Sequence, residues 1–207
     1  MNDKNFDRIS YALGLSMGNN FRASGIESID VADFAEGVQA VFSGSTDLRM
    51  SYDEAKEEIR RYFTAMQERQ QAEAAKAGEQ NRRLGSAYLA DNGKRPEVVT
   101  TASGLQYEII CKGEGATPKD TDRVKVHYTG RLIDGTVFDD SVERGEPATF
   151  GVTQVIPGWV EALQLMPVGS KWRLHIPSEL AYGPNGAGGV IGPDAVLVFD
   201  VELLEIL

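Results

Sequence analysis

The hydrophobic positions in the first half of the chain recur every three or four residues, which is the spacing of one face of an α-helix. They predict a first helix that Gly25 ends, and a second helix from about residue 30 to residue 42, before Gly44. The first stripe is formed by Phe6, Ile9, Leu13, Met17 and Phe21. The second, which we expect to face inward, is formed by Val31, Phe34, Ala35, Val38 and Phe42.

A third helix is predicted to begin at Ser51, because serine is a favourable N-cap and Glu54, three residues later, completes a capping box. No proline precedes Pro96, so this helix can continue to about Asp91. The hydrophobic stripe of its first part, which we expect to be buried, is formed by Ala55, Ile59, Tyr62, Phe63 and Met66.

Residues 67–83, in the middle of this helix, contain no large hydrophobic side chain. The section has nothing to bury, so we expect it to lie in solvent as a spacer arm that separates its ends by about 25 Å. The alternative is a helix that breaks at Gly78 or Gly85, since a glycine inside a helix costs about 1 kcal/mol relative to alanine.

In the second half of the chain, hydrophobic and polar residues alternate with a period of two, as in half-buried β-strands. Asp134-Gly135 lies between two such stretches and predicts a tight hairpin. One short helix fits the remaining gap, with a hydrophobic face formed by Trp159, Ala162, Leu163 and Met166. The predicted fold class is α+β: an all-α N-terminal region with a long connecting helix, then a twisted antiparallel sheet covered by one short helix.

Composition places a boundary between the two halves. All eight prolines lie from Pro96 onward, and the chain before them carries a net charge of −2, against −8 for the rest. We therefore expect a helical domain over residues 1–66, a spacer arm and linker over residues 67–95, and a second domain over residues 96–207.

The helical domain is too small to build a large core, and units of this size often associate. Gly14 and Gly18 on the first helix would let two backbones approach closely, which favours a homodimer through this domain. The alternative is that these glycines only admit the second helix of the same chain.

The chemistry of the chain argues against several classes of function. A net charge of −10 is poorly suited to binding nucleic acid. The single cysteine, Cys111, cannot form an internal disulfide, and His127 and His175 offer little material for a metal site, so we expect no metal and no cofactor. Both histidines lie on the polar face of predicted strands, where a solvated or locally hydrogen-bonded role is expected.

No hydrophobic run approaches the roughly 18–20 residues that a membrane span needs. The polar residues 1–8 lack the hydrophobic core of a secretory signal, which makes the cytoplasm the simplest expectation. The alternative is a periplasmic or surface-exposed protein whose export signal has been removed.

Aromatic side chains of the second half are the remaining candidates for a site. The sequence offers no convincing nucleophile or metal-carboxylate arrangement, and the glycine-rich residues 183–189 do not lead into the helix start of a phosphate loop. A sheet covered by one short helix has little room for six aromatic rings in a closed core, so some of them could line a pocket; alternatively, they are core residues. The six are Tyr128, Phe138, Phe150, Trp159, Tyr182 and Phe199.

Several motifs within residues 100–207 resemble, in order and spacing, the FKBP-type peptidyl-prolyl isomerases. They are Val126-His127-Tyr128-Thr129-Gly130, Asp134-Gly135-Thr136-Val137-Phe138-Asp139, Val155-Ile156-Pro157-Gly158-Trp159, Ala181-Tyr182-Gly183 and the ending Leu197-Val198-Phe199-Asp200-Val201-Glu202-Leu203-Leu204. The first half, with its long third helix, resembles the N-terminal dimerisation region of the bacterial FKBP subfamily that includes macrophage infectivity potentiator.

The resemblance implies a half-barrel sheet wrapped on a helix, with a hydrophobic cleft between them. It implies catalytic roles for Asp139, Tyr182 and Tyr128, although Asp139 acts either electrostatically on the reacting amide or as a structural hydrogen-bond acceptor. It further implies that substrate is bound by Phe138, Phe150, Val155, Ile156, Trp159, Val190, Ile191 and Phe199.

Three positions depart from the family pattern. Ala148 stands where many relatives have an aromatic wall residue, and Ala187 and Gly192 occupy loop positions that are often bulkier or proline. The segment between Phe150 and Val155 also looks about two residues shorter than in small family members. These departures bear on loop contacts and on the affinity for macrolide inhibitors of the family more than on the chemistry.

The implied function is cis-trans isomerisation of X-Pro bonds in unfolded or partly folded proteins, by a V-shaped homodimer with chaperone-like client binding. The alternative is a protein-binding holdase chaperone in which isomerase activity is incidental. Neither reading involves nucleic acid, a membrane span or a cofactor.

Overall fold

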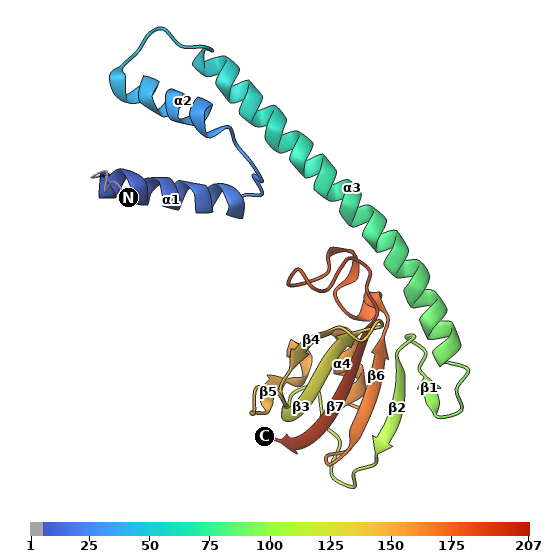
Figure 1. The fold of residues 1–207 in the computed structure, drawn as a ribbon. Coiled ribbons are helices and arrows are strands. Elements are labelled where there is room, and N and C mark those ends of the chain that lie inside the picture. The colour runs from blue at the N-terminus through green and yellow to red at the C-terminus, as the bar shows by residue number, and fades with distance from the viewer. Residues whose placement is uncertain (1–5) are drawn as a thin grey trace, which may run out of the picture. The chain divides into compact units, whose positions relative to one another are not determined.

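The computed structural model describes residues 6–207, which divide into two compact units, one ending at Gln70 and one spanning Gln71–Leu207. Figure 1 shows the order of their elements along the chain. Residues 1–5, part of the polar start on which the expectation about a secretory signal depends, lie outside the described residues. Among the described residues, no helix is both long enough and apolar enough to cross a membrane.

The first unit contains the helices α1 (Arg8–Ala23) and α2 (Val31–Ser43) and the beginning of α3 (Tyr52–Asn92). Each begins where a side chain satisfies free backbone N–H groups. The carboxylate of Asp7 accepts from the N–H of Ser10 at 2.7 Å before α1, and that of Asp30 accepts from the following turn before α2.

The predicted capping box at the start of α3 is present. The Ser51 hydroxyl accepts from the backbone N–H of Glu54 at 3.2 Å, and the Glu54 carboxylate accepts from the backbone N–H of Ser51 at 2.7 Å. α3 then continues without a break through Gly78 and Gly85, so the alternative of a broken helix is wrong.

The expectation that the hydrophobic stripes of the first unit are buried is wrong for the single chain. Neither α1 nor α2 has a buried residue, although the rings of Phe21 and Phe34 meet edge to face with centroids 5.5 Å apart. Phe42 is 88% exposed and Ile59 on α3 is 58% exposed. Three helices with so few mutual contacts do not enclose a core among the described residues of the first unit, so much of the amphipathic pattern stays exposed there.

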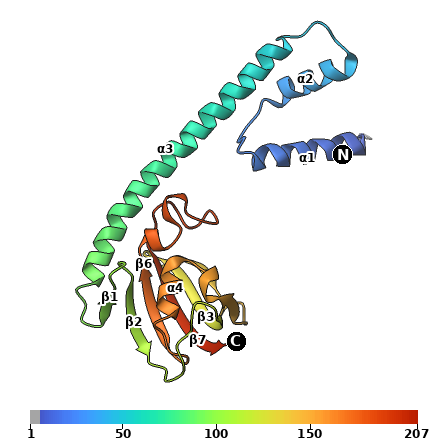
Figure 2. The same ribbon diagram turned by 180° about the vertical axis from the view of Figure 1, so that it is seen from behind.

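The second unit is built on an antiparallel sheet with the strand order β1-β2-β6-β7-β3-β4, to which β5 adds by pairing with β3. The short helix α4 (Pro157–Leu163) lies against one face of this sheet (Figure 2). The strands are β1 (Val98–Thr100), β2 (Gln106–Cys111), β3 (Arg123–Leu132), β4 (Val137–Asp140), β5 (Ala148–Gly151), β6 (Lys171–Ile176) and β7 (Leu197–Ile206). This α+β architecture agrees with the predicted fold class.

The core of the second unit lies between α4 and the inner face of the sheet. Trp159, Ala162 and Leu163 of α4 are buried there, and Met166 is buried just beyond the end of the helix. The sheet contributes hydrophobic residues that alternate along its strands, among them Val124, Val126, Leu174, Ile176, Leu197, Val201 and Leu203.

The second half of α3 packs against the sheet domain, which corrects the expectation of solvent around all of residues 67–83. Gly78 and Gly85 are buried, and a Cβ at Gly85 would come within 2.5 Å of Val196 Cγ2. The two glycines therefore let the helix backbone approach the domain closely, a role that a pattern of hydrophobic side chains does not report. The finer division of the chain at residues 66 and 95 stays a prediction.

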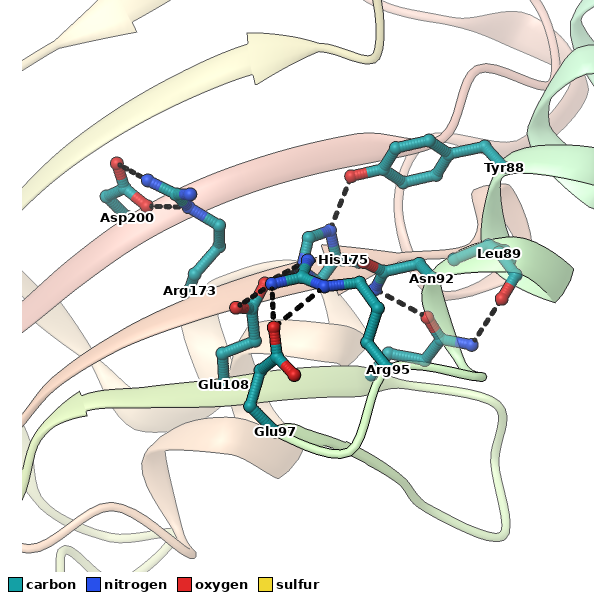
Figure 3. Close-up of polar contacts among 10 residues, drawn as sticks. Tyr88, Leu89, Asn92, Arg95, Glu97, Glu108, Arg173, His175 and Asp200 are labelled. Atoms are coloured by element: carbon teal, nitrogen blue, oxygen red, sulfur yellow. Dashed lines mark hydrogen bonds and ion pairs between the residues drawn. The ribbon is translucent and has the colours of Figure 1, made fainter.

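A polar network fixes the end of α3 to β2 and β6 (Figure 3). The Tyr88 hydroxyl lies 2.6 Å from Nδ1 of the buried His175, whose Nε2 lies 2.8 Å from the carboxylate of Glu108. Burial lowers the pKa of His175 more than Glu108 raises it, so the neutral ring accepts from Tyr88 and donates to Glu108. Nearby, the Asn92 amide donates to Gln106 at 2.9 Å.

The contact at Gly85 reverses the usual effect of a glycine-to-alanine change in a helix. Gly85→Ala should destabilise the protein despite the better helix propensity of alanine, because the new methyl group overlaps Val196. Gly37→Ala in α2, where an added Cβ would meet none of the described atoms within 4 Å apart from its chain neighbours and the helix backbone itself, should instead stabilise by about 0.5–1 kcal/mol. Urea unfolding of both variants measures the difference, and equal effects would contradict the close packing at Gly85.

Candidate active site

A cavity of about 560 Å³ is lined by α4 and the segment just before it, by β3, β4, β5 and β7, and by the loop that joins β6 to β7. The structure brings together at this cavity all eleven residues that the sequence analysis assigned to a site. They are Tyr128, Phe138, Asp139, Phe150, Val155, Ile156, Trp159, Tyr182, Val190, Ile191 and Phe199.

Trp159 lies at the centre of the aromatic lining. It is only 4% exposed, because it lies on the face of α4 that packs into the core against the sheet. Its ring meets those of Tyr128 and Phe199 edge to face, with centroids 5.2 and 5.3 Å apart, and that of Phe150 at 6.0 Å. Edge-to-face contacts fix ring orientation, so the hydrophobic surface of the cavity is preformed.

Gly130 on β3 makes room for two of these rings. A Cβ at this position would come within 2.6 Å of Phe138 and 2.7 Å of Phe199, whose rings meet edge to face with centroids 5.5 Å apart. Only glycine allows both rings to reach the cavity from neighbouring strands.

One charged cluster lies on the wall of the cavity. The Tyr128 hydroxyl donates a short hydrogen bond to one carboxylate oxygen of Asp139, and Arg144 donates to the other. Arg144 also donates to the Tyr128 hydroxyl at 3.2 Å, and its guanidinium lies 5.7 Å from the centroid of the Tyr128 ring. Both oxygens of Asp139 are therefore held in place, which fixes the carboxylate at the cavity wall.

The environment keeps Asp139 ionised. Partial burial raises the pKa of Asp139, but the hydrogen bonds from Tyr128 and Arg144 together outweigh it, so the net pKa lies below its ordinary value. Burial, and then the neighbouring carboxylate, raise the pKa of Tyr128. The cluster thus presents a carboxylate and a neutral phenol at neutral pH, and neither group is poised for proton transfer.

These directions predict a flat pH profile. Activity should stay constant across the neutral range and fall only as Asp139 protonates, below the ordinary carboxyl value of 3.8. Because the folded-state pKa is depressed, the ionised carboxylate also stabilises the fold above the unfolded pKa, and this contribution is lost as pH falls through the folded value. Measuring kcat/KM against pH at constant ionic strength checks this; an acid limb above about pH 5 would contradict it.

Two polar groups face the cavity beside this cluster. Ile156 precedes α4, and its carbonyl accepts from the N–H groups of Trp159 and Val160, while within residues 6–207 its own N–H has no hydrogen-bond partner. Tyr182, after β6, is exposed at the opening. Both can therefore meet the polar backbone of an incoming peptide.

The loop between β6 and β7 closes the remaining side. Ala187 and Ile191 pair through two backbone hydrogen bonds of 2.8 and 3.0 Å, which place Ile191 inward while Val190 stays exposed. Of the departures from the family pattern, Ala187 lines the cavity, whereas Ala148 and Gly192 do not.

The two histidines lie away from the cavity. His127 Nδ1 lies 3.0 Å from the hydroxyl of Ser141, and His175 is buried beneath α3. The expectation of a local hydrogen-bonded role thus fits both, but His175 is not solvated. Within residues 6–207, no three His, Cys, Asp or Glu side chains gather where they could hold a metal ion.

Sequence reasoning missed four residues of the site. Arg144 lies in a turn after β4, five residues beyond Asp139, and its only signal was a positive charge in a polar stretch. Gln154, Ala187 and Gly188 also line the cavity. Their inclusion depends on how the two loops fold back toward α4, which no local pattern encodes.

Comparison with known families agrees with this geometry. A family model described as "FKBP-type peptidyl-prolyl cis-trans isomerase" matches residues 114–204, and one described as "Domain amino terminal to FKBP-type peptidyl-prolyl isomerase" matches residues 6–109.

Relatives match over nearly the whole chain. The "FKBP-type 22 kDa peptidyl-prolyl cis-trans isomerase" of Escherichia coli is 48% identical and is covered, like this chain, over 100% of its length. The "Outer membrane protein MIP" of Legionella longbeachae is 44% identical over 97% of this chain and 85% of its own. Among solved structures, that of FkpA from Escherichia coli is 37% identical, with a TM-score of 0.71 over 100% of this chain and 98% of that one.

With the cavity, the fold and both family matches in agreement, the chain belongs to the FKBP-type peptidyl-prolyl cis-trans isomerases.

Proposed function

We propose that the cavity binds the prolyl residue of an unfolded or partly folded protein and accelerates proline-limited folding. The observation that supports this is the preformed aromatic lining around Trp159, with the fixed Asp139 carboxylate on its wall. A proline ring is compact and hydrophobic, so it can fill such a cavity by burial alone.

Isomerisation of the bond before proline needs little more than a hydrophobic cavity that binds the prolyl ring. Rotation about the C–N bond before proline crosses a barrier of about 18–20 kcal/mol, because twisting breaks the amide resonance. The twisted amide is less polar than the planar one, so a dry aromatic cavity favours it relative to water. No covalent bond is made or broken, which is why neither a nucleophile nor a proton donor is part of the proposal.

Three polar groups have assigned roles in this proposal. The N–H of Ile156 holds the substrate main chain, and the hydroxyl of Tyr182 donates to a substrate carbonyl. Asp139 acts on the carbonyl carbon of the reacting amide electrostatically, which its depressed pKa supports. The alternative of a purely structural acceptor also has support, because Tyr128 and Arg144 occupy both of its oxygens.

A refolding assay tests the proposal. A denatured protein whose refolding is limited by a trans-to-cis proline should refold faster when catalytic amounts of this protein are added. An unchanged slow phase, with the added protein shown to be folded by circular dichroism, would remove the proposal.

We also propose that the chain forms a homodimer through its first unit. The support is the set of hydrophobic side chains on α1, α2 and early α3 that the single chain leaves exposed, Phe42 and Ile59 among them. So many exposed large hydrophobic side chains on three neighbouring helices of the chain are typical of an interface. Sedimentation velocity at micromolar concentration should give twice the chain mass of 22.6 kDa, and a species of 22.6 kDa would contradict the dimer.

The holdase alternative rests on the same exposed surface, which could hold unfolded clients as well as a second copy. It predicts that the second unit alone isomerises a short peptide but fails to accelerate refolding of a protein. The truncated chain should begin at Gln71 and not at residue 96, because the second half of α3 packs on the sheet domain. If residues 71–207 equal the full chain on protein substrates, the holdase reading loses its support.

Two finer expectations remain proposals. Macrolide inhibitors of the family should compete with peptide for the cavity, with an affinity that depends on the small side chain that Ala187 contributes to its lining. For the compartment, the name of the Legionella relative, an outer membrane protein, supports the exported alternative over the cytoplasmic expectation. Competition binding and cell fractionation test them.

A further inference from the structure

The second half of α3 runs beside the loop between β6 and β7, the orange-to-red segment of Figure 1. The side chains of two consecutive helix residues reach the end of that loop. The amide Nδ2 of Asn81 donates to the carbonyl oxygen of Pro193 at 2.8 Å. The guanidinium of Arg82 lies 2.5 Å from the carboxylate of Asp194.

We propose that Asn81 and Arg82 are positioning residues that hold this loop over the cavity and thereby set the affinity for proline substrates. The inference rests on the proposed function, because it takes the cavity to be the substrate site. It assigns to the connecting helix a part in substrate binding, in addition to linking the two halves of the chain.

The contact between helix and loop is close. A Cβ at Gly78 would come within 2.8 Å of the Asp194 carboxylate, and one at Gly192 would come within 3.0 Å of the Asn81 amide. Glycine on both sides lets the two backbones approach until Asn81 and Arg82 reach their partners directly. Asp194 is 13% exposed, against 57% for Arg82, so the acidic partner is the shielded member of the ion pair.

The backbone of the loop shows why it needs an anchor. Asp194 has a φ of 56°, and it is the only residue other than glycine with a positive φ within residues 6–207. A non-glycine residue in this region persists only when its surroundings hold it there. Two contacts restrain Asp194 in this conformation. Arg82 binds its carboxylate, and the backbone N–H of Asp194 donates to the carbonyl of Gly183 at 2.8 Å.

The anchor lies three residues from the cavity. Ile191, which lines it, is pinned by its two backbone hydrogen bonds to Ala187, and a Cβ at Gly186 would come within 2.1 Å of the Ile191 carbonyl oxygen. The loop is thus folded tightly upon itself between Gly183 and Asp194. Restraining the position of Asp194 therefore also restrains Ile191, because the short segment between them has little freedom to move.

The helix is itself a firm support. Nearer its C-terminal end the helix is hydrogen-bonded to the sheet, by Tyr88 to His175 and by Asn92 to Gln106 (Figure 3). Asn81 and Arg82 therefore project from a fixed element. A loop held in its binding conformation before substrate arrives loses less conformational freedom on binding. Release of the anchor should therefore weaken substrate binding and leave the chemical step unchanged.

The experiment compares Arg82→Ala and Asn81→Ala with Arg83→Ala in the full-length protein. Arg83 is the next residue of the same helix and is exposed, and no salt bridge joins it to the described residues, which makes it a matched control for loss of charge and helix propensity. On a proline tetrapeptide, the KM of Arg82→Ala should rise about threefold and that of the double variant Asn81→Ala/Arg82→Ala about tenfold, with kcat unchanged. Arg83→Ala should match the wild type.

Two further measurements separate positioning from a general loss of stability. Exchange of the Ile191 amide hydrogen should be faster in Arg82→Ala than in Arg83→Ala, while that of Leu174 in the core of the sheet stays equal. Asp194→Asn, which keeps a residue that tolerates positive φ, should raise KM as much as Arg82→Ala, with no additional rise when both are combined. Arg82→Lys should restore part of the affinity.

The outcomes are distinct. Equal KM values for Arg82→Ala, Arg83→Ala and the wild type would overturn the inference and leave the isomerase proposal intact. A wild-type protein that does not isomerise the peptide would overturn the proposed function itself. A fall in kcat with unchanged KM would also overturn the inference, because it would place the helix in the chemical step and not in binding.

Discussion

Trp159→Ala should abolish most of the substrate binding and cost about 3–5 kcal/mol of stability. The indole is nearly fully buried and contacts three other aromatic rings of the cavity, so its removal leaves a void in the place where the prolyl ring would rest. The hydrophobic surface that favours the twisted amide is lost with it. We expect kcat/KM for a proline peptide to fall more than about tenfold, with a higher KM from the lost binding surface and a lower kcat from the lost surface around the twisted amide.

Trp172 provides the matched control. It is 3% exposed, close to the 4% of Trp159, and it stacks on Tyr107 with ring centroids 4.4 Å apart, but it does not line the cavity. Trp172→Ala should lose a similar amount of stability in urea unfolding. Its KM, measured in the cold where circular dichroism verifies the fold, should stay near that of the wild type. If both variants lose binding equally, the effect of Trp159→Ala is a loss of fold and the cavity assignment fails.

Asp139→Asn should reduce kcat/KM about tenfold or more while leaving the fold in place. The change keeps the shape of the side chain but removes the negative charge from the cavity wall, and it leaves Arg144 facing an amide in place of a carboxylate. If Asp139 acts electrostatically on the reacting amide, the loss appears in kcat. If it only holds Tyr128 in place, the loss appears in KM.

Asp140, the next residue, provides a control for a general change of charge. Asp140 accepts from the N–H groups of Val142 and Glu143 at 2.7 and 3.0 Å. It does not line the cavity of about 560 Å³. Asp140→Asn should therefore weaken the turn slightly and keep the catalytic parameters close to those of the wild type. Equal losses for Asp139→Asn and Asp140→Asn would contradict a specific role for Asp139.

Much of the local structure was predictable because it follows from short-range rules. Caps at Asp30 and Ser51 begin helices where free N–H groups need acceptors, and the period of two along β3 and β6 matches the buried face of the sheet. The unbroken course of α3 was harder to predict, since Gly78 and Gly85 weaken a helix on propensity alone. They are tolerated because their lack of a side chain is what the contact with the sheet domain requires.

The residues of the site were predictable only in part, because some of them reach it only through the tertiary fold. The resemblance of the motifs around Tyr128, Phe138, Trp159 and Tyr182 to a known family assigned these residues to one site, whereas the aromatic pattern alone left open whether they are core residues. Arg144 belongs to no such motif. It joins the cluster because the turn after β4 returns it to Asp139, and the sequence marks that return with nothing more than a charged residue.

The sequence by itself determined the helices of the first half and the alternating strands of the second. These are consequences of backbone geometry and of hydrophobic spacing, which act over a few residues. Only the tertiary structure decided that α3 packs on the domain that carries the cavity, that His175 is buried beneath it and that Asn81 and Arg82 reach the substrate loop. Those contacts join residues about 90 to 110 positions apart, and the small and polar side chains that make them carry no hydrophobic pattern.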